Sequence, residues 1–76
     1  MRAIELSPAV IVGTGLVGAS VGCALTAAGI DVHLFDAVAS HATVAASLGA
    51  GTTEPVEAAD VRLVVVAVPP AYLADE

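Results

Sequence analysis

Three short segments, each closed by a turn signal, predict the strands of a parallel sheet. They are Ala9–Val12, Ile30–Phe35 and Leu63–Val68. The first is a continuous apolar run that ends at a glycine turn, which is typical of a strand that is buried on both faces. The second alternates and is rich in residues that favour strands. The third segment is the most strand-like, because valine and leucine fill most of it and Pro69 stops it.

The segments between these strands predict helices. Leu16–Ala28 is expected to be helical and to end at Gly29, where glycine can adopt the left-handed conformation. Ser40 can cap a second helix that runs to Leu48. Strands that alternate with helices predict a parallel sheet with crossover helices.

Shorter features are expected elsewhere in the chain. Residues 51–53 could form a very short strand, and Thr53 could cap a helical turn with Pro55 near its start. Residues 71–76 would open another helix. We therefore expect a Rossmann-like α/β fold, with the first strand between the second and the third.

The expected sheet corresponds to the first mononucleotide-binding half of a Rossmann domain. We interpret residues 1–76 as the amino-terminal part of a dinucleotide-binding domain, truncated within that domain. Such an isolated chain is expected to be marginally stable and to expose an aggregation-prone sheet edge.

A glycine motif follows the first strand directly and opens the first helix. Gly13, Gly15 and Gly18 form G-x-G-x-x-G. In such a loop the first glycine makes the turn, the second lets a pyrophosphate approach the backbone, and the third allows the helix to pack closely on the sheet. The free N–H groups of Leu16 and Val17 would then face the phosphates. The alternative is a glycine-rich turn that binds no ligand.

An acidic residue ends the second strand. Asp36 follows Gly18 by 18 positions, close to the spacing of about 20 that dinucleotide-binding units show. Its carboxylate could accept hydrogen bonds from the adenosine ribose and would repel a 2′-phosphate, so the sequence favours NAD over NADP. Val68 and Pro69, at the end of the third strand, are expected to border the same cofactor crevice as Gly13 and Asp36. The alternative for Asp36 is a solvated loop aspartate.

Composition excludes several other classes of protein. Eight acidic residues against two basic ones give a net charge of −6, which argues against nucleic-acid binding and against a polybasic membrane patch. The segment between Ser7 and Ile30 has no charged residue, so a membrane-spanning helix is a rival interpretation. Its many glycines disfavour that helix.

The remaining polar residues indicate no catalytic or metal site. His33 and His41 have no partner at metal-ligand spacing, so we expect surface or satisfied core histidines. Cys23 cannot form an internal disulfide and is interpreted as a packing residue. A solvated acidic edge is expected from the carboxylates of Glu54, Glu57 and Asp60.

These motifs together resemble the amino-terminal part of prephenate dehydrogenases. The resemblance rests on residues 10–20 (VIVGTGLVGAS), on the aspartate after the second strand, on residues 48–50 (LGA) and on residues 64–70 (VVVAVPP). It covers nearly the whole chain, but its motifs are cofactor motifs. Relatives with the same opening include 3-hydroxyacid dehydrogenases and pyrroline-5-carboxylate reductases.

The resemblance implies a cytoplasmic NAD-dependent enzyme of tyrosine biosynthesis, a homodimer when full length. In such enzymes prephenate loses a hydride from the ring carbon that bears the hydroxyl, and it loses its ring carboxylate as the ring aromatises to 4-hydroxyphenylpyruvate. The family's catalytic histidine and substrate-binding arginine lie downstream of the matched segment, so no catalytic residue is assigned here and the 76 residues alone are expected to be inactive. Two alternatives remain: a related enzyme for another small hydroxy acid or imino acid, or a non-catalytic nucleotide-binding fragment.

Overall fold

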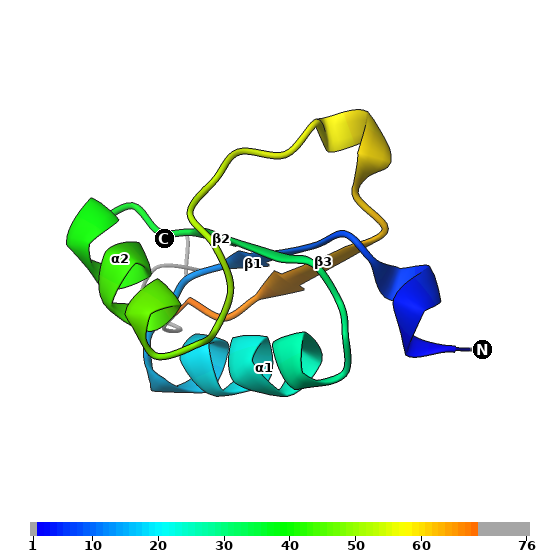
Figure 1. Ribbon diagram of the computed structural model, residues 1–76. Helices are drawn as coiled ribbons and strands as arrows, with labels where there is room; N and C mark the ends of the chain where they lie inside the picture. The colour runs from blue at the N-terminus through cyan, green and yellow to red at the C-terminus, as the bar shows by residue number, and fades with distance from the viewer. Residues whose placement is uncertain (1, 69–76) are drawn as a thin grey trace.

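The computed structural model describes residues 2–68, which form a three-stranded parallel sheet with helices between the strands (Figure 1). The strands are β1 (Ala9–Val12), β2 (Val32–Phe35) and β3 (Leu63–Val66), and their order in the sheet is β2-β1-β3. β1 pairs in parallel with both neighbours. The predicted Rossmann-like α/β class and the central position of the first strand are therefore confirmed.

The first helix and the second strand meet in a turn that shortens the predicted strand. Helix α1 (Leu16–Ala27) ends at a glycine, Gly29, whose φ is +90° as expected. The N–H of Ile30 then donates to the carbonyl of Leu25. Because Ile30 is held by the helix end in this way, β2 begins at Val32 instead of Ile30.

The second helix, α2 (Ala39–Ser47), begins before the predicted cap, so the assignment of Ser40 as its cap is wrong. Val38 is the residue that precedes the helix, and no side chain caps it. The carboxylate of Asp36 accepts a hydrogen bond from the N–H of Val38 at 2.9 Å. This contact turns the chain into the helix directly after β2, two residues earlier than a Ser40 cap would allow.

The segment after α2 adds one residue to the sheet. Residues 51–53, expected to be a short strand, contribute a single parallel bridge between Thr52 and His33. The helical turn predicted at Thr53 is wrong, because the hydroxyl of Thr52 accepts the N–H of Glu54 and forms a local turn instead. A 3-10 helix, η2 (Ala58–Asp60), follows.

The sheet has different cover on its two faces. Helices α1 and α2 lie against one face, and the segment 53–62 passes over the opposite one (Figure 1). The buried core lies under the helices and consists of small and aliphatic residues: Ala9, Ile11, Ile30, Val32, Leu34, Ala42, Ala45 and Ala50. A short 3-10 helix, η1 (Ala3–Leu6), precedes the first strand.

The uncharged stretch from Ser7 to Ile30 is not one continuous helix. It contains β1, the glycine loop and α1, which has 12 residues. Within residues 2–68, none of the helices combines the length and the apolar character needed to cross a bilayer. The third strand ends at Val66, earlier than predicted, although the N–H of Ala67 still donates to the carbonyl of Val12 at 2.8 Å. The helix expected at residues 71–76 lies outside the described residues.

Candidate functional site

The glycine loop leaves β1 at the centre of the sheet. The N–H of Gly13 donates to the carbonyl of Phe35 at 2.8 Å, so the loop begins beside the end of β2. Gly13 has a φ of +93°, which other residues rarely adopt, and a Cβ there would lie 2.9 Å from the carbonyl oxygen of Ala67. The turn therefore requires glycine and sits where all three strands end.

The other two glycines of the motif differ in what surrounds them. Gly18 is buried, and a Cβ on it would overlap the carbonyl oxygen of Gly13. Gly15 is exposed, and a Cβ on it would meet no atom of the chain within 4 Å. Packing of the chain accounts for Gly18, whereas no atom of the described residues requires glycine at position 15.

The amino-terminal end of α1 is open to solvent. Gly15 precedes the helix and its carbonyl accepts the N–H of Ala19 at 2.8 Å, but no side chain caps the helix. The first N–H groups of a helix have no partner within it. The side chains of Leu16 and Val17 beside them are 85% and 66% exposed. This end of α1 is thus free to hold an anionic group.

Asp36 is hydrogen-bonded to the glycine loop. Its Oδ2 accepts the N–H of Thr14 at 2.8 Å and the Thr14 hydroxyl at 2.9 Å, while Oδ1 accepts the N–H of Val38. These bonds, the one from Val38 first and those from Thr14 next, lower the pKa of Asp36 from 3.8 to about 2. The carboxylate is therefore ionised at neutral pH and only 12% exposed, so it is not a freely solvated loop residue.

Two residues of this site were missed in the sequence. Thr14 is 6% exposed, and its position between two glycines was the available signal. His41 lies in the first turn of α2 and places Nδ1 3.5 Å from Oδ1 of Asp36. Its signal was weaker, because only the entry of the chain into α2 directly after Asp36 brings it there.

A groove of about 460 Å³ separates the glycine loop from α2. Its walls come from the loop, the start of α1 and one side of α2: Thr14, Gly15, Leu16, Ala19, Ser40, His41, Val44, Ala45 and Leu48. On the other side of the loop, Val68 comes close to Gly13, since its Cγ1 would lie 2.9 Å from a Cβ there. Pro69, the last of the predicted cofactor residues, lies outside the described residues.

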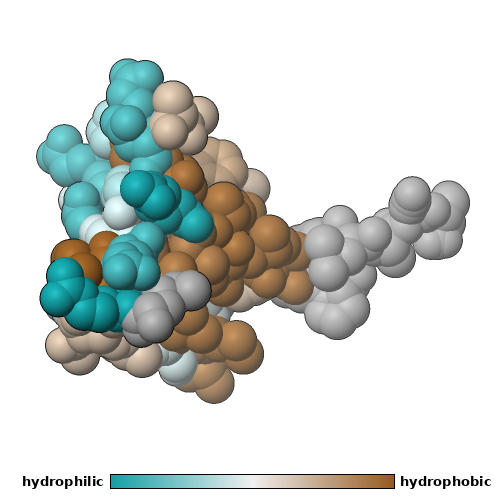
Figure 2. Space-filling model, turned by 90° about the vertical axis from the view of Figure 1, so that its right-hand side faces the viewer, coloured by the Kyte–Doolittle hydropathy of each residue, from teal (hydrophilic) through white to brown (hydrophobic). Residues whose placement is uncertain are grey.

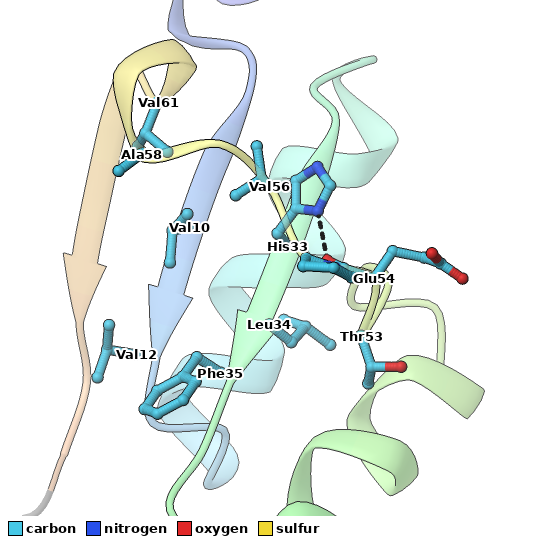
Figure 3. Close-up of a pocket in the computed structure, with 11 residues that line it drawn as sticks. Val10, Val12, His33, Leu34, Phe35, Thr53, Glu54, Val56, Ala58 and Val61 are labelled. Atoms are coloured by element: carbon cyan, nitrogen blue, oxygen red, sulfur yellow. Dashed lines mark hydrogen bonds between the residues drawn. The ribbon is translucent and has the colours of Figure 1, made fainter.

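A second hollow of about 410 Å³ lies under the segment 53–62, and Figure 3 shows the side chains that line it. It is apolar except for His33, Thr53 and Glu54, and the glycine loop and Asp36 are not among its lining residues. His33 is a satisfied histidine, as predicted, because its Nδ1 lies 2.8 Å from the Glu54 carbonyl and its Nε2 lies 3.1 Å from a carboxylate oxygen of Asp31. We regard this hollow as packing space beneath the crossover.

The other polar residues singled out in the sequence lie outside this site. Cys23 is partly buried, and its Sγ lies 3.6 Å from the carbonyl of Leu48. Glu54, Glu57 and Asp60 are exposed, as expected for a solvated edge. Across residues 2–68, no three histidine, cysteine or acidic side chains gather in a way that could hold a metal ion.

Comparison with known proteins gives one similarity to a curated protein. The chain is 48% identical over 67 residues to probable prephenate dehydrogenase NovF from Streptomyces niveus. The match includes 87% of this chain and 18% of the length of that protein. No family model matches the chain, and no solved structure matches it. This similarity supports the resemblance to the prephenate dehydrogenase family that the motifs predicted.

Proposed function

We propose that this segment is the NAD-binding part of a prephenate dehydrogenase. The observation that carries the proposal is the meeting of the glycine loop and an ionised Asp36 at the carboxyl ends of the strands. This edge is a switch point, because the chain passes from β1 to β2 on one side and then crosses over to β3 on the other side of β1. Open parallel sheets bind their ligands at such points.

The residues present fit the groups of a dinucleotide. The space at Gly15 and the uncapped N–H groups of Leu16 and Val17 suit a pyrophosphate, while Gly13 and Gly18 hold the loop in shape. The carboxylate of Asp36 would accept a hydrogen bond from a ribose hydroxyl, and Val68 and Pro69 would border the cofactor crevice. When bound, NAD supplies the acceptor for the hydride that prephenate loses.

The remaining parts of the proposal concern the full-length protein. Its catalytic histidine and its substrate-binding arginine would come from outside this segment, so the 76 residues alone would not turn over prephenate. We expect the complete enzyme to be a cytoplasmic homodimer. Formation of 4-hydroxyphenylpyruvate by the purified full-length protein, given prephenate and NAD⁺, is the direct assay, and failure with prephenate but not with another hydroxy acid would change the substrate.

A single methyl group tests the phosphate site. Gly15→Ala adds a Cβ that touches nothing in the chain, and the backbone at this position (φ −68°, ψ −166°) suits any residue. We expect the full-length variant to fold normally and to bind NAD⁺ at least about tenfold more weakly, measured by titration calorimetry. Ala24→Val, on an exposed position of the same helix, is the control and should bind as the wild type does. Unchanged affinity in Gly15→Ala would contradict the proposal.

Asp36 tests the choice of cofactor. A charged hydrogen bond contributes about 1.5–3 kcal/mol, or roughly a factor of 10 to 100 in affinity. In the full-length enzyme Asp36→Ser should lower the preference for NAD by about that factor, and adding Ala37→Arg should raise the use of NADP further. The measurement is the ratio of kcat/KM for the two cofactors. A ratio that stays within about twofold would remove the main support for NAD.

A further inference from the structure

The hydrogen bonds of Asp36 leave little of its carboxylate for a ligand. An ionised carboxylate offers about four acceptor positions on its two oxygens. Oδ2 already accepts two hydrogen bonds from Thr14, and Oδ1 accepts one from the N–H of Val38. Among the described residues, one acceptor position on Oδ1 therefore remains uncommitted. A ribose hydroxyl has to use that position or displace one of the hydrogen bonds from Thr14 or Val38.

His41 is the side chain that faces this oxygen. Its Nδ1 lies 3.5 Å from Oδ1 of Asp36, which is longer than a good hydrogen bond, and the side chain is 60% exposed. The ring lines the groove between the glycine loop and α2. A hydroxyl that enters at Oδ1 consequently comes to lie next to the imidazole, and so does any phosphate carried on that ribose.

We propose that His41 is a specificity-determining residue of the cofactor site, which sets how strongly a ribose 2′-phosphate is rejected beside Asp36. This inference rests on the proposed binding of a dinucleotide at the glycine loop. A neutral imidazole leaves the repulsion between Asp36 and the 2′-phosphate in place. A protonated one attracts the phosphate and partly cancels the carboxylate charge, so discrimination against NADP weakens as the pH falls.

The charges around His41 make the pH dependence simple to assign. Asp36 is the one ionisable side chain within salt-bridge distance of the ring in residues 2–68, and the groove is otherwise lined by the hydroxyls of Thr14 and Ser40 and by apolar side chains. The pKa of Asp36 is about 2, so its charge does not change between pH 5.5 and pH 8.

The test uses the full-length protein and the ratio of two dissociation constants. We would measure Kd for NADP⁺ and NAD⁺ by titration calorimetry from pH 8 to pH 5.5 in the wild type, in His41→Gln and in His41→Arg. The 2′-phosphate itself titrates near pH 6, but this contribution is common to all three proteins. The ratio Kd(NADP⁺)/Kd(NAD⁺) should fall about two- to fivefold more in the wild type than in His41→Gln, as expected for an exposed charge pair.

His41→Arg carries a fixed charge and should show the lowered ratio at every pH. If His41 had only a structural role, its substitution would weaken the binding of NAD⁺ and NADP⁺ equally and leave the ratio of the two dissociation constants unchanged. Identical pH profiles in the wild type and His41→Gln, together with an unaltered ratio in His41→Arg, would overturn the inference while the NAD site stands. Absence of NAD⁺ binding to the wild type at any pH would instead overturn the proposed function, and the inference with it.

Discussion

The two faces of the sheet are both largely apolar in sequence but very differently covered. On the helical side, alternate residues of β1 and β2 are buried, with Ile11 at 0% and Val32 at 2% exposure. On the opposite side the intervening residues are also apolar except for His33, yet Phe35, Val64 and Val66 are 60%, 56% and 59% exposed. Figure 2 shows hydrophobic residues gathered over the middle of the view, with most of the hydrophilic residues to one side of them.

The difference comes from what each face packs against. Helices α1 and α2 approach the sheet closely because small residues, such as Gly22 and Ala45, occupy the buried positions of these helices. The segment 53–62 reaches the other face only through a few side chains, among them Val56 and Val61, and leaves the hollow of Figure 3 beneath it. Strands of this composition are typical of sheets covered on both faces, so hydropathy alone does not reveal which face forms the core.

Truncation of a side chain on each face should produce the largest difference in the free energy of unfolding between the two faces. Ile11→Ala removes a fully buried side chain and should lower the free energy of unfolding by about 2–5 kcal/mol. Val64→Ala, on the outer face of β3, should cost less than about 1 kcal/mol, mainly through strand propensity. Urea unfolding of the chain, followed by circular dichroism, measures both. Equal losses would show that the outer face is buried as well.

An added methyl group probes the close approach of α1 to the sheet. In Gly22→Ala the new Cβ would lie 2.5 Å from the carbonyl oxygen of Ala50 and 3.1 Å from Cδ1 of Ile11. We expect a loss of about 1–3 kcal/mol in the same unfolding measurement, because the core has to expand. The control is Ser20→Thr, which adds a methyl group at an exposed position of α1 and should change stability by less than about 0.5 kcal/mol. If both variants matched the wild type, the packing of α1 would be looser than described.

The smallest effect concerns the contact that holds the segment 53–62 on the outer face. Burial lowers the pKa of His33, but its hydrogen bonds to the Glu54 carbonyl and to Asp31, with the charges of these two residues, outweigh this and raise the pKa above 6.5. Both partners are acceptors, so only the protonated ring can donate to both. The stabilisation is fully present below pH 6.5 and is lost as the pH rises through the raised pKa.

We expect the urea midpoint of the chain to fall slightly as the pH rises from 6 to 8. The corresponding loss in the free energy of unfolding should be less than about 1 kcal/mol, since Asp31 is 64% exposed. His33→Gln retains His41 and should flatten this dependence. A variant with the same pH profile as the wild type would show that His33 does not hold the crossover through its charge.

Local signals determined most of the secondary structure. The three strands, α1 and the stop at Gly29 follow from apolar runs and from a glycine whose φ is indeed positive. The sequence also predicted that Gly13 and Asp36 lie together, because parallel strands bring their carboxyl ends to one edge. The assignment of Ser40 as the cap was wrong because the start of α2 is set by Asp36. The Asp36 carboxylate accepts the N–H of Val38, which turns the chain, and it also accepts hydrogen bonds from Thr14.

The tertiary structure decided everything that depends on residues distant in sequence. Thr14 and Asp36 are 22 positions apart, and their bonds exist only because β1 and β2 pair in one register. The same pairing, followed by the immediate start of α2, brings His41 to the carboxylate. The path of the segment 53–62 over one face of the sheet likewise cannot be predicted from the residues of that segment alone. Hydropathy and glycine positions are properties of a short segment, whereas hydrogen-bond partners and burial are set by which segments become neighbours in space.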